Sequence, residues 1–366
     1  MDRAFAAGAP RWPVGGALMK NVWRVLGALV ALAVLGGASY AGYWYVAAGK
    51  VRATIEAWAA DPSADQKVSL GAVAVSGFPD RLIATISSIG ISRPNGALPW
   101  QYTAENLRLT RGLGGDTTTI RIFGPQTLTY TADGKSQTAK AQARQFQVEL
   151  RTDADGAFTG FALGLTDFAL ERPEAGPLSI ARASVQMAKG SGAAGIINDK
   201  TRFAVQVDGL KMPEYRRGAL GDTIEQLVFN AAVTQPLASL DLPITLAKWR
   251  DSNGYVTVTN VTMRWGTLDM TGLSSGVLRI DQQMRVKGGM SVGVANYMLV
   301  IDAFHAARKL NQEARAAAQA AINFLGGRGA NTRIGLQLEI DEGNVNVGPA
   351  TLGTVGPIIP AGRSAG

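Results

Sequence analysis

The residues from Val25 to Gly49 form an uninterrupted run of 25 residues without a charged side chain. Because a helix rises about 1.5 Å per residue, this run can cross the roughly 30 Å hydrocarbon core of a bilayer. Four basic residues and one acidic residue precede it, and short positively charged flanks remain in the cytoplasm. We therefore expect a cytoplasmic tail over 1–24, a single-pass transmembrane helix over 25–49, and export of the remaining residues, about 317.

The outer end of this run distinguishes a retained anchor from a cleaved signal peptide. It carries four aromatic residues: Tyr40, Tyr43, Trp44 and Tyr45. Such rings prefer the headgroup layer of a membrane, which favours a retained anchor. The alternative is a signal peptide whose apolar region is Leu26–Leu35 and whose cleavage site is Ser39-Tyr40-Ala41. Met19 offers a second translation start beside Met1.

The charge of the exported part argues against nucleic acid as a partner. The chain has a net charge of +8, and without the residues before the run 32 basic and 27 acidic residues remain, a net charge of +5. No basic block with interleaved aromatic residues occurs, as nucleic-acid binding would require. The chain has no Cys, which excludes disulfides and thiolate sites. Its stability must therefore come from apolar burial.

Alternation of apolar and polar residues dominates the exported part. From Val68 onward the period is two, which is typical of half-buried strands. Examples are Leu82 to Ile86, Leu107 to Leu109, Ile120 to Ile122, Leu128 to Tyr130, Arg202 to Leu210, and Tyr255 to Val294. Turn signals such as Asn95-Gly96 and Asp133-Gly134 separate the runs at short intervals. This pattern predicts a succession of antiparallel strands.

Two helices interrupt or precede the strands. Val51, Ile55 and Trp58 fall on one helical face, so a short helix should pack its stripe on the sheet and end before Asp61-Pro62. A longer pattern with a period near 3.6 runs over 297–325 and ends at Gly326-Gly327. It predicts one long helix that supports the sheet.

Small-residue segments divide the exported part. Gly190–Gly195 has the composition of a linker. We therefore predict an N-terminal β-rich half over 50–190 and a C-terminal β-rich half over 196–360, followed by a disordered tail over 361–366. The fold class is mainly β (α+β), with one or more curled, multi-stranded antiparallel sheets, one long supporting helix, and the transmembrane helix before them.

Several motifs in this chain resemble those of one family. They are Gly77-Phe78-Pro79-Asp80-Arg81, Pro99-Trp100, Trp249-Arg250 before Gly254, Met263 to Leu268, Asp281 after Leu278, and Asp341 to Gly348. Over nearly the whole exported chain they are similar to the family catalogued as domain of unknown function 2125. The resemblance implies an alphaproteobacterial envelope protein without established activity, anchored in the bacterial inner membrane with its bulk in the periplasm.

The residues give little support for an enzyme. The single His, His305, lies within the predicted long helix, and the carboxylates are scattered rather than clustered. Neither Gly112-Leu113-Gly114-Gly115 nor Gly326-Gly327-Arg328-Gly329 joins a strand to a helix as phosphate-binding loops do. We predict no catalytic residue, no metal site and no cofactor.

Binding of lipid or other apolar envelope material is the function that this composition favours. Many alternating strands that are rich in Ala, Gly, Leu and Val can curl into an apolar trough that accepts acyl chains, as in AsmA-like envelope proteins. The predicted lining residues are Phe78, Trp100, Trp249 and Trp265. One alternative is an envelope scaffold that binds proteins and no ligand, and a third is a carboxylate-dependent hydrolase. The predicted partners are therefore the inner membrane through 25–49, and lipid or envelope proteins.

Overall fold

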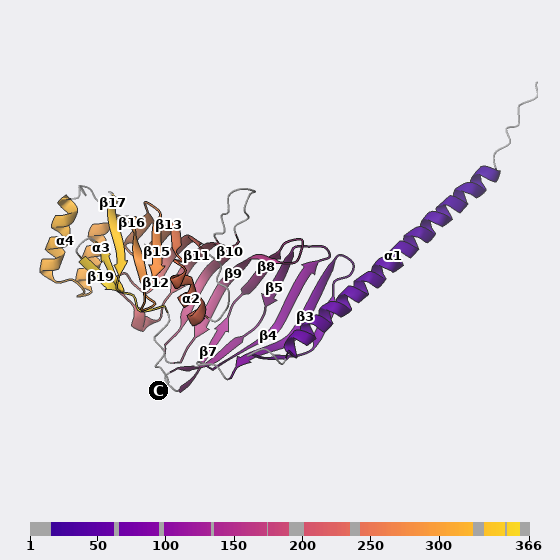
Figure 1. The fold of residues 1–366 in the computed structure, drawn as a ribbon, viewed down its shortest axis with the longest axis horizontal. Helices are drawn as coiled ribbons and strands as arrows, with labels where there is room; N and C mark the ends of the chain where they lie inside the picture. Colours follow the sequence, from indigo (N-terminus) through magenta and orange to yellow (C-terminus); the bar gives the residue numbers. More distant parts are fainter. Residues whose placement is uncertain are drawn as a thin grey trace, which may run out of the picture.

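The computed structural model describes residues 16–61, 66–94, 99–132, 135–173, 175–189, 201–234, 242–324, 333–347 and 350–358. The side chains before Val34 are outside this description, as are the predicted tail over 361–366 and most of the predicted cytoplasmic tail. Figure 1 shows an elongated sheet with a long helix projecting from one end and short helices at the other.

The N-terminal helix α1 extends from Gly16 to Ala59. The short helix predicted around Ile55 is the last part of α1, and Ile55 packs on the first strands as expected. Trp58 on the same stripe is exposed. Among the described residues, no helix combines the length and the hydropathy that crossing a bilayer requires.

The strands form one antiparallel sheet. Their bounds in the first part of the chain are β1 Lys67–Leu70, β2 Val73–Ser76, β3 Arg81–Arg93, β4 Trp100–Gly112, β5 Thr117–Ile122, β6 Gln126–Ala132, β7 Lys135–Gln142, β8 Gln145–Thr152, β9 Phe158–Glu171 and β10 Leu178–Ala188. In the second part they are β11 Thr201–Lys211, β12 Thr223–Val233, β13 Val256–Trp265, β14 Leu268–Gly272, β15 Gly276–Ile280, β16 Val286–Ala295, β17 Ile334–Asp341, β18 Asn344–Val347 and β19 Ala350–Thr354.

Most strands of the sheet pair with a neighbour along the chain, but β1 pairs with β3, β5 with β8, and β7 with β9. Several strands are broken in two, so that β5 and β6 pair with different parts of β4, and β14 and β15 pair with different parts of β13. One such break is at Gly124, which has a φ of +77° that L side chains rarely adopt. The prediction of a mainly β, antiparallel fold is confirmed, although its strands form a single sheet.

The single long helix predicted over 297–325 is wrong. The structure has two helices there, α3 Tyr297–Ala306 and α4 Gln312–Phe324, and residue 325 lies outside the described part. The chain reverses between them, where Arg308 has a φ of +56°, a conformation that no helix can contain. Arg315 of α4 donates a 2.7 Å hydrogen bond to Asp302 of α3 and fixes their relative position.

Two further features differ from or extend the sequence predictions. A ten-residue helix, α2 Leu242–Asp251, lies between β12 and β13, where no helix was predicted. The linker predicted at Gly190–Gly195 lies outside the described residues. The strands on its two sides, β10 and β11, pair from Ser179 opposite Lys211 to Ala188 opposite Arg202.

Candidate functional site

One face of the sheet is apolar from the first strands to the last. The register places apolar residues of successive strands opposite one another in a first row: Val73, Ile86, Leu107, Ile122, Phe146, Leu165, Ala183, Val207, Leu227, Met263, Met270, Val294 and Ile334. A second row lies beside it: Val75, Ala84, Leu109, Ile120, Val148, Leu163, Val185, Val205, Phe229 and Val261. We call the face that carries both rows the inner face.

The opposite face, which we call the outer face, carries polar or small residues in the corresponding row, apart from Val228. Its corresponding row is Thr85, Arg108, Arg121, Gln147, Gly164, Ser184, Gln206, Val228, Thr262, Thr271, Gly293 and Gly335. Successive side chains of a strand point to opposite faces, so the alternation in the sequence produces this division. The outer face is suited to water, and the inner face needs an apolar cover.

Helices cover the inner face at both ends of the sheet. At the N-terminal end, Ile55 of α1 packs on a cluster that includes the buried residues Ile86 and Leu107. At the C-terminal end, Tyr297 and Ile301 of α3 complete a larger buried cluster. Other members of the C-terminal cluster are Val258, Val261, Met290, Val292, Val294 and Ile334. These two ends are conventional cores.

The middle of the inner face, from β8 to β12, is only half-buried. Its large apolar side chains all have intermediate exposure: Phe146, Val148, Leu150, Phe161, Leu163, Leu165, Val185, Met187, Phe203, Val205, Val207, Leu227 and Phe229. With a spacing of about 4.8 Å between neighbouring strands, the axes of these five strands extend over roughly 19 Å. We call this stretch the open groove.

Helix α2 covers one side of the open groove and borders an open cavity of about 360 Å³. Its lining is apolar except for Arg279: Phe203, Val205, Phe229, Ala231, Val233, Leu246, Trp249, Val256, Leu278, Ile280, Val286 and Ile358. The indole Nε1 of Trp249 donates a 2.7 Å hydrogen bond to the Thr234 carbonyl oxygen, which fixes the ring above the strands. A Cβ at Gly254 would come within 2.4 Å of that ring, so glycine is required there for the ring to fit.

A second cavity of about 530 Å³ lies on the inner face nearer to α1. Trp100, Tyr102, Leu128, Tyr130 and Thr131 line it. The hydroxyls of Tyr102 and Tyr130 donate 3.0 Å hydrogen bonds to glutamine side chains, which leaves the ring faces as its apolar surface. Burial raises the pKa of Tyr102, so this phenol stays neutral in the physiological range.

The four predicted lining residues do not form one site. Trp100 and Trp249 line the two cavities of the inner face. Phe78 lies in the turn between β2 and β3, half-exposed against α1. Trp265 ends β13 and donates a 3.3 Å hydrogen bond to the Gly221 carbonyl oxygen. The Trp265-Gly266 pair thus belongs to the hairpin that joins β13 to β14.

Sequence reasoning missed the residues that form the floor of the α2 cavity, notably Phe203, Val205 and Phe229. Their period-two alternation identifies them as facing one side of a strand. It does not show that β11 and β12 are neighbours, or that α2 lies above them. The sequence alone therefore did not show which strands pair or which of their residues lie opposite one another.

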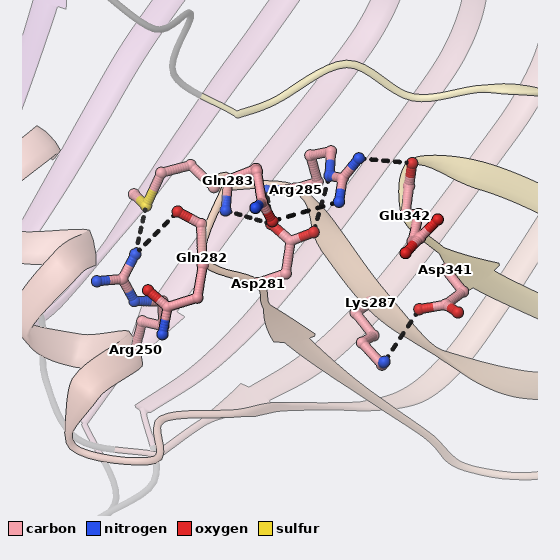
Figure 2. A network of polar contacts seen from close by, with 9 residues as sticks. Arg250, Asp281, Gln282, Gln283, Arg285, Lys287, Asp341 and Glu342 are labelled. Atoms are coloured by element: carbon pink, nitrogen blue, oxygen red, sulfur yellow. Dashed lines mark hydrogen bonds and ion pairs between the residues drawn. The ribbon is translucent and has the colours of Figure 1, made fainter.

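A polar network joins α2 to the turns at one end of the sheet (Figure 2). Asp281 accepts hydrogen bonds from the backbone N–H and the guanidinium of Arg285, at 2.8 and 2.7 Å. Arg285 also donates to the Glu342 carbonyl oxygen at 2.9 Å. From α2, Arg250 reaches the Gln282 carbonyl oxygen at 3.4 Å. Burial raises the pKa of Asp281, but these hydrogen bonds together hold it below its ordinary value.

The described residues contain no group of three His, Cys, Asp or Glu side chains placed to hold a metal ion. The ring nitrogen Nδ1 of His305 lies 3.0 Å from the Leu310 carbonyl oxygen, in the reversal between α3 and α4. This contact gives His305 a structural role at the end of α3.

Comparison with known proteins gives a family and no relative of known function. The family model described as an uncharacterised protein conserved in bacteria, DUF2125, matches residues 44–356. Neither a curated protein nor a solved structure matches the chain.

Proposed function

The chain belongs to the DUF2125 family of uncharacterised bacterial proteins, and from its structure we propose that it binds the acyl chains of lipids along the open groove. In this proposal residues 25–49 anchor it in the bacterial inner membrane, and the sheet lies in the periplasm. The protein acts as a carrier surface, and we assign it no catalysis. Its partners are membrane lipid and the envelope components that exchange lipid with it.

The observation that carries this proposal is the half-buried apolar surface of β8 to β12 between two covered ends. A continuous exposed apolar patch marks a binding site in soluble proteins. Each methylene group that leaves water gains about 0.8 kcal/mol, so an acyl chain laid across five strands would be strongly held. The small or polar outer face cannot offer such a gain.

The α2 cavity supports the same ligand class. Its lining side chains are aliphatic or aromatic apart from Arg279. Such a site selects for apolar shape, and gives no set of convergent polar groups for recognising a polar metabolite. We propose that it holds the end of the acyl chain and that α2 shields that end from water.

Site-specific crosslinking of the full-length chain in cells tests this function. The photoreactive amino acid benzoylphenylalanine would replace Val148 or Val205 on the inner face, with Gln147 and Gln206, their outer-face neighbours, as matched controls. We expect lipid adducts in mass spectra from the inner positions and none from the outer positions. Equal adducts from both faces, or none from either, would refute the proposal. Protein adducts at Val148 and Val205 would favour the scaffold alternative.

A charge in the groove provides a second readout. Val205→Lys should lower the amount of lipid that co-purifies with the protein, because a lysine in an acyl-chain environment costs about 2.5–3.5 kcal/mol. Gln206→Lys adds the same charge to the exposed outer face and should leave the bound lipid unchanged. Circular dichroism of both variants would show that each is folded.

A further inference from the structure

The turn between β2 and β3 is tied to the aromatic outer end of the predicted anchor. The Tyr40 hydroxyl donates a 2.7 Å hydrogen bond to the Pro79 carbonyl oxygen. Trp44 Nε1 donates a 2.9 Å hydrogen bond to the Arg81 carbonyl oxygen, and Trp44 is only 4% exposed. These two bonds join residues 37 to 39 positions apart in the sequence and fix the turn at one height along α1.

The same turn places a third large ring beside these two. The ring centroid of Phe78 is 6.2 Å from that of Tyr40 and 5.7 Å from that of Trp44. Phe78 nevertheless remains 51% exposed. On the adjoining helix surface Tyr43 and Tyr45 are 61% and 69% exposed. Several exposed aromatic rings close together on one surface are unfavourable in water, and such a cluster is typical of the membrane interface.

The conformation of the turn depends on Gly77. This residue has a φ of +103°, and a Cβ on it would lie 2.9 Å from the Arg81 carbonyl oxygen. Any other residue would therefore force the turn open. The glycine allows the chain to bend sharply enough for Phe78 to reach the helix.

From these contacts we infer that the β2–β3 turn, with Phe78 at its tip, inserts into the headgroup layer of the bilayer and places the first edge of the sheet on the membrane surface. This inference rests on the proposed membrane anchor and names the bilayer as the source of the lipid. Tyr40 and Phe78 are in ring contact, so any membrane position that puts Tyr40 at the interface also puts Phe78 there.

The charges beside Phe78 are compatible with this position. Arg81 donates a 2.7 Å hydrogen bond to Asp80, its neighbour in sequence. This bond lowers the pKa of Asp80 and raises that of Arg81, so both stay ionised and their charges cancel. The turn therefore brings no net charge to the headgroup layer.

Contact at this edge gives lipid a route into the groove. The inner-face pair nearest the turn is Val75 of β2 and Ala84 of β3. From this pair the second row continues through the half-buried residues Leu109 and Ile120 to Val148 in the open groove. An acyl chain that leaves the bilayer at the turn would follow this second row, because Ile86 and Leu107 of the first row are buried.

Depth measurement with a spin label tests this inference. The chain has no Cys, so Phe78→Cys introduces a single labelling site. Phe158→Cys is the matched control, because Phe158 is a similarly exposed phenylalanine on the distant strand β9. Both full-length variants would carry a nitroxide in vesicles of phosphatidylethanolamine and phosphatidylglycerol. Collision with aqueous nickel chelate should be lost at position 78 and retained at position 158.

Two further measurements give this test a definite outcome. Asp80→Cys places a label on the same turn without removing a ring, and it should also be shielded from nickel. If both turn labels collide with nickel as freely as the label at position 158, membrane docking of the turn is wrong. In that case, lipid adducts at Val148 and Val205 would still support the acyl-chain groove. If these adducts were also absent, both the groove and the docked turn would be rejected.

Discussion

The C-terminal end and the middle of the inner face have the same sequence pattern and different surroundings. Val258 and Val292 at the covered end are 1% and 2% exposed. Val205, a residue of the same type on the same face, is only half-buried in the open groove. The difference comes from α3 and α4, which pack on one region and leave the other uncovered. Alternation thus makes a face apolar, and the covering helices decide whether that face becomes a core or a binding surface.

This comparison also separates stability from function. A buried aliphatic side chain stabilises the fold by about 1.5–3 kcal/mol relative to an exposed one. The covered ends obtain this stabilisation from the protein itself. In the open groove, complete burial of the apolar side chains requires a bound ligand. Substitutions of groove residues should therefore lower the free energy of unfolding less than substitutions at the covered ends.

The largest expected effect tests this difference directly. Val258→Asp buries an unpaired carboxylate and should cost more than about 4 kcal/mol of the free energy of unfolding, or prevent folding. Val205→Asp on the same face should cost less, about 1–3 kcal/mol, because Val205 is only half-buried. Urea unfolding of both variants gives the comparison. Similar losses for the two variants would mean that the groove is a closed core.

The cover provided by α2 should show an intermediate effect. Gly254→Ala places a methyl group against the Trp249 ring and should cost about 1–3 kcal/mol, because the ring must move. We also expect fewer lipid adducts at Val205, because Val205 and Trp249 line the same cavity. Gly164→Ala is the control, because a Cβ there meets no atom within 4 Å. Unchanged adducts in folded Gly254→Ala would show that α2 is not part of the site.

Strands were predictable from the sequence because each signal is local. The alternation around Leu82 to Ile86 and Arg202 to Leu210 follows from one-sided burial, and β3 and β11 lie there. Pairing is not local, so the apolar rows and the open groove could not be predicted. Trp100 and Trp249 were proposed as lining residues for their ring size, which does not distinguish them from Phe78 and Trp265.

Helices were predicted less well, for two physical reasons. The apolar residues over 297–325 keep a spacing near 3.6 across the reversal, and that spacing does not mark Arg308, whose φ of +56° ends the helix. Helix α2 is short and has few apolar residues to show a period. The sequence signal there was Asp241-Leu242-Pro243, because Asp is a residue type that favours the start of a helix and Pro is favoured in its first turn.

The smallest expected effect concerns the polar network between the two regions (Figure 2). Asp281→Asn weakens the hydrogen bonds with Arg285 and should cost about 1–2 kcal/mol near pH 7. Because folding holds the pKa of Asp281 below its ordinary value of 3.8, its stabilisation is present above that value and is lost as the pH falls through the folded pKa. The unfolding curves of the native chain and the variant should therefore converge only below about pH 4.

The control for this experiment is Asp167→Asn. Asp167 pairs with Arg144 at 2.7 Å, but both side chains are largely exposed, and such pairs contribute little. Asparagine also tolerates the positive φ of this position. We expect no pH-dependent difference for Asp167→Asn. If Asp281→Asn behaves in the same way, the network does not stabilise the fold. If Asp281→Asn is destabilised and also gives fewer lipid adducts at Val205, the network holds α2 over the open groove through Arg250. The network then links the covered end of the inner face to the open groove.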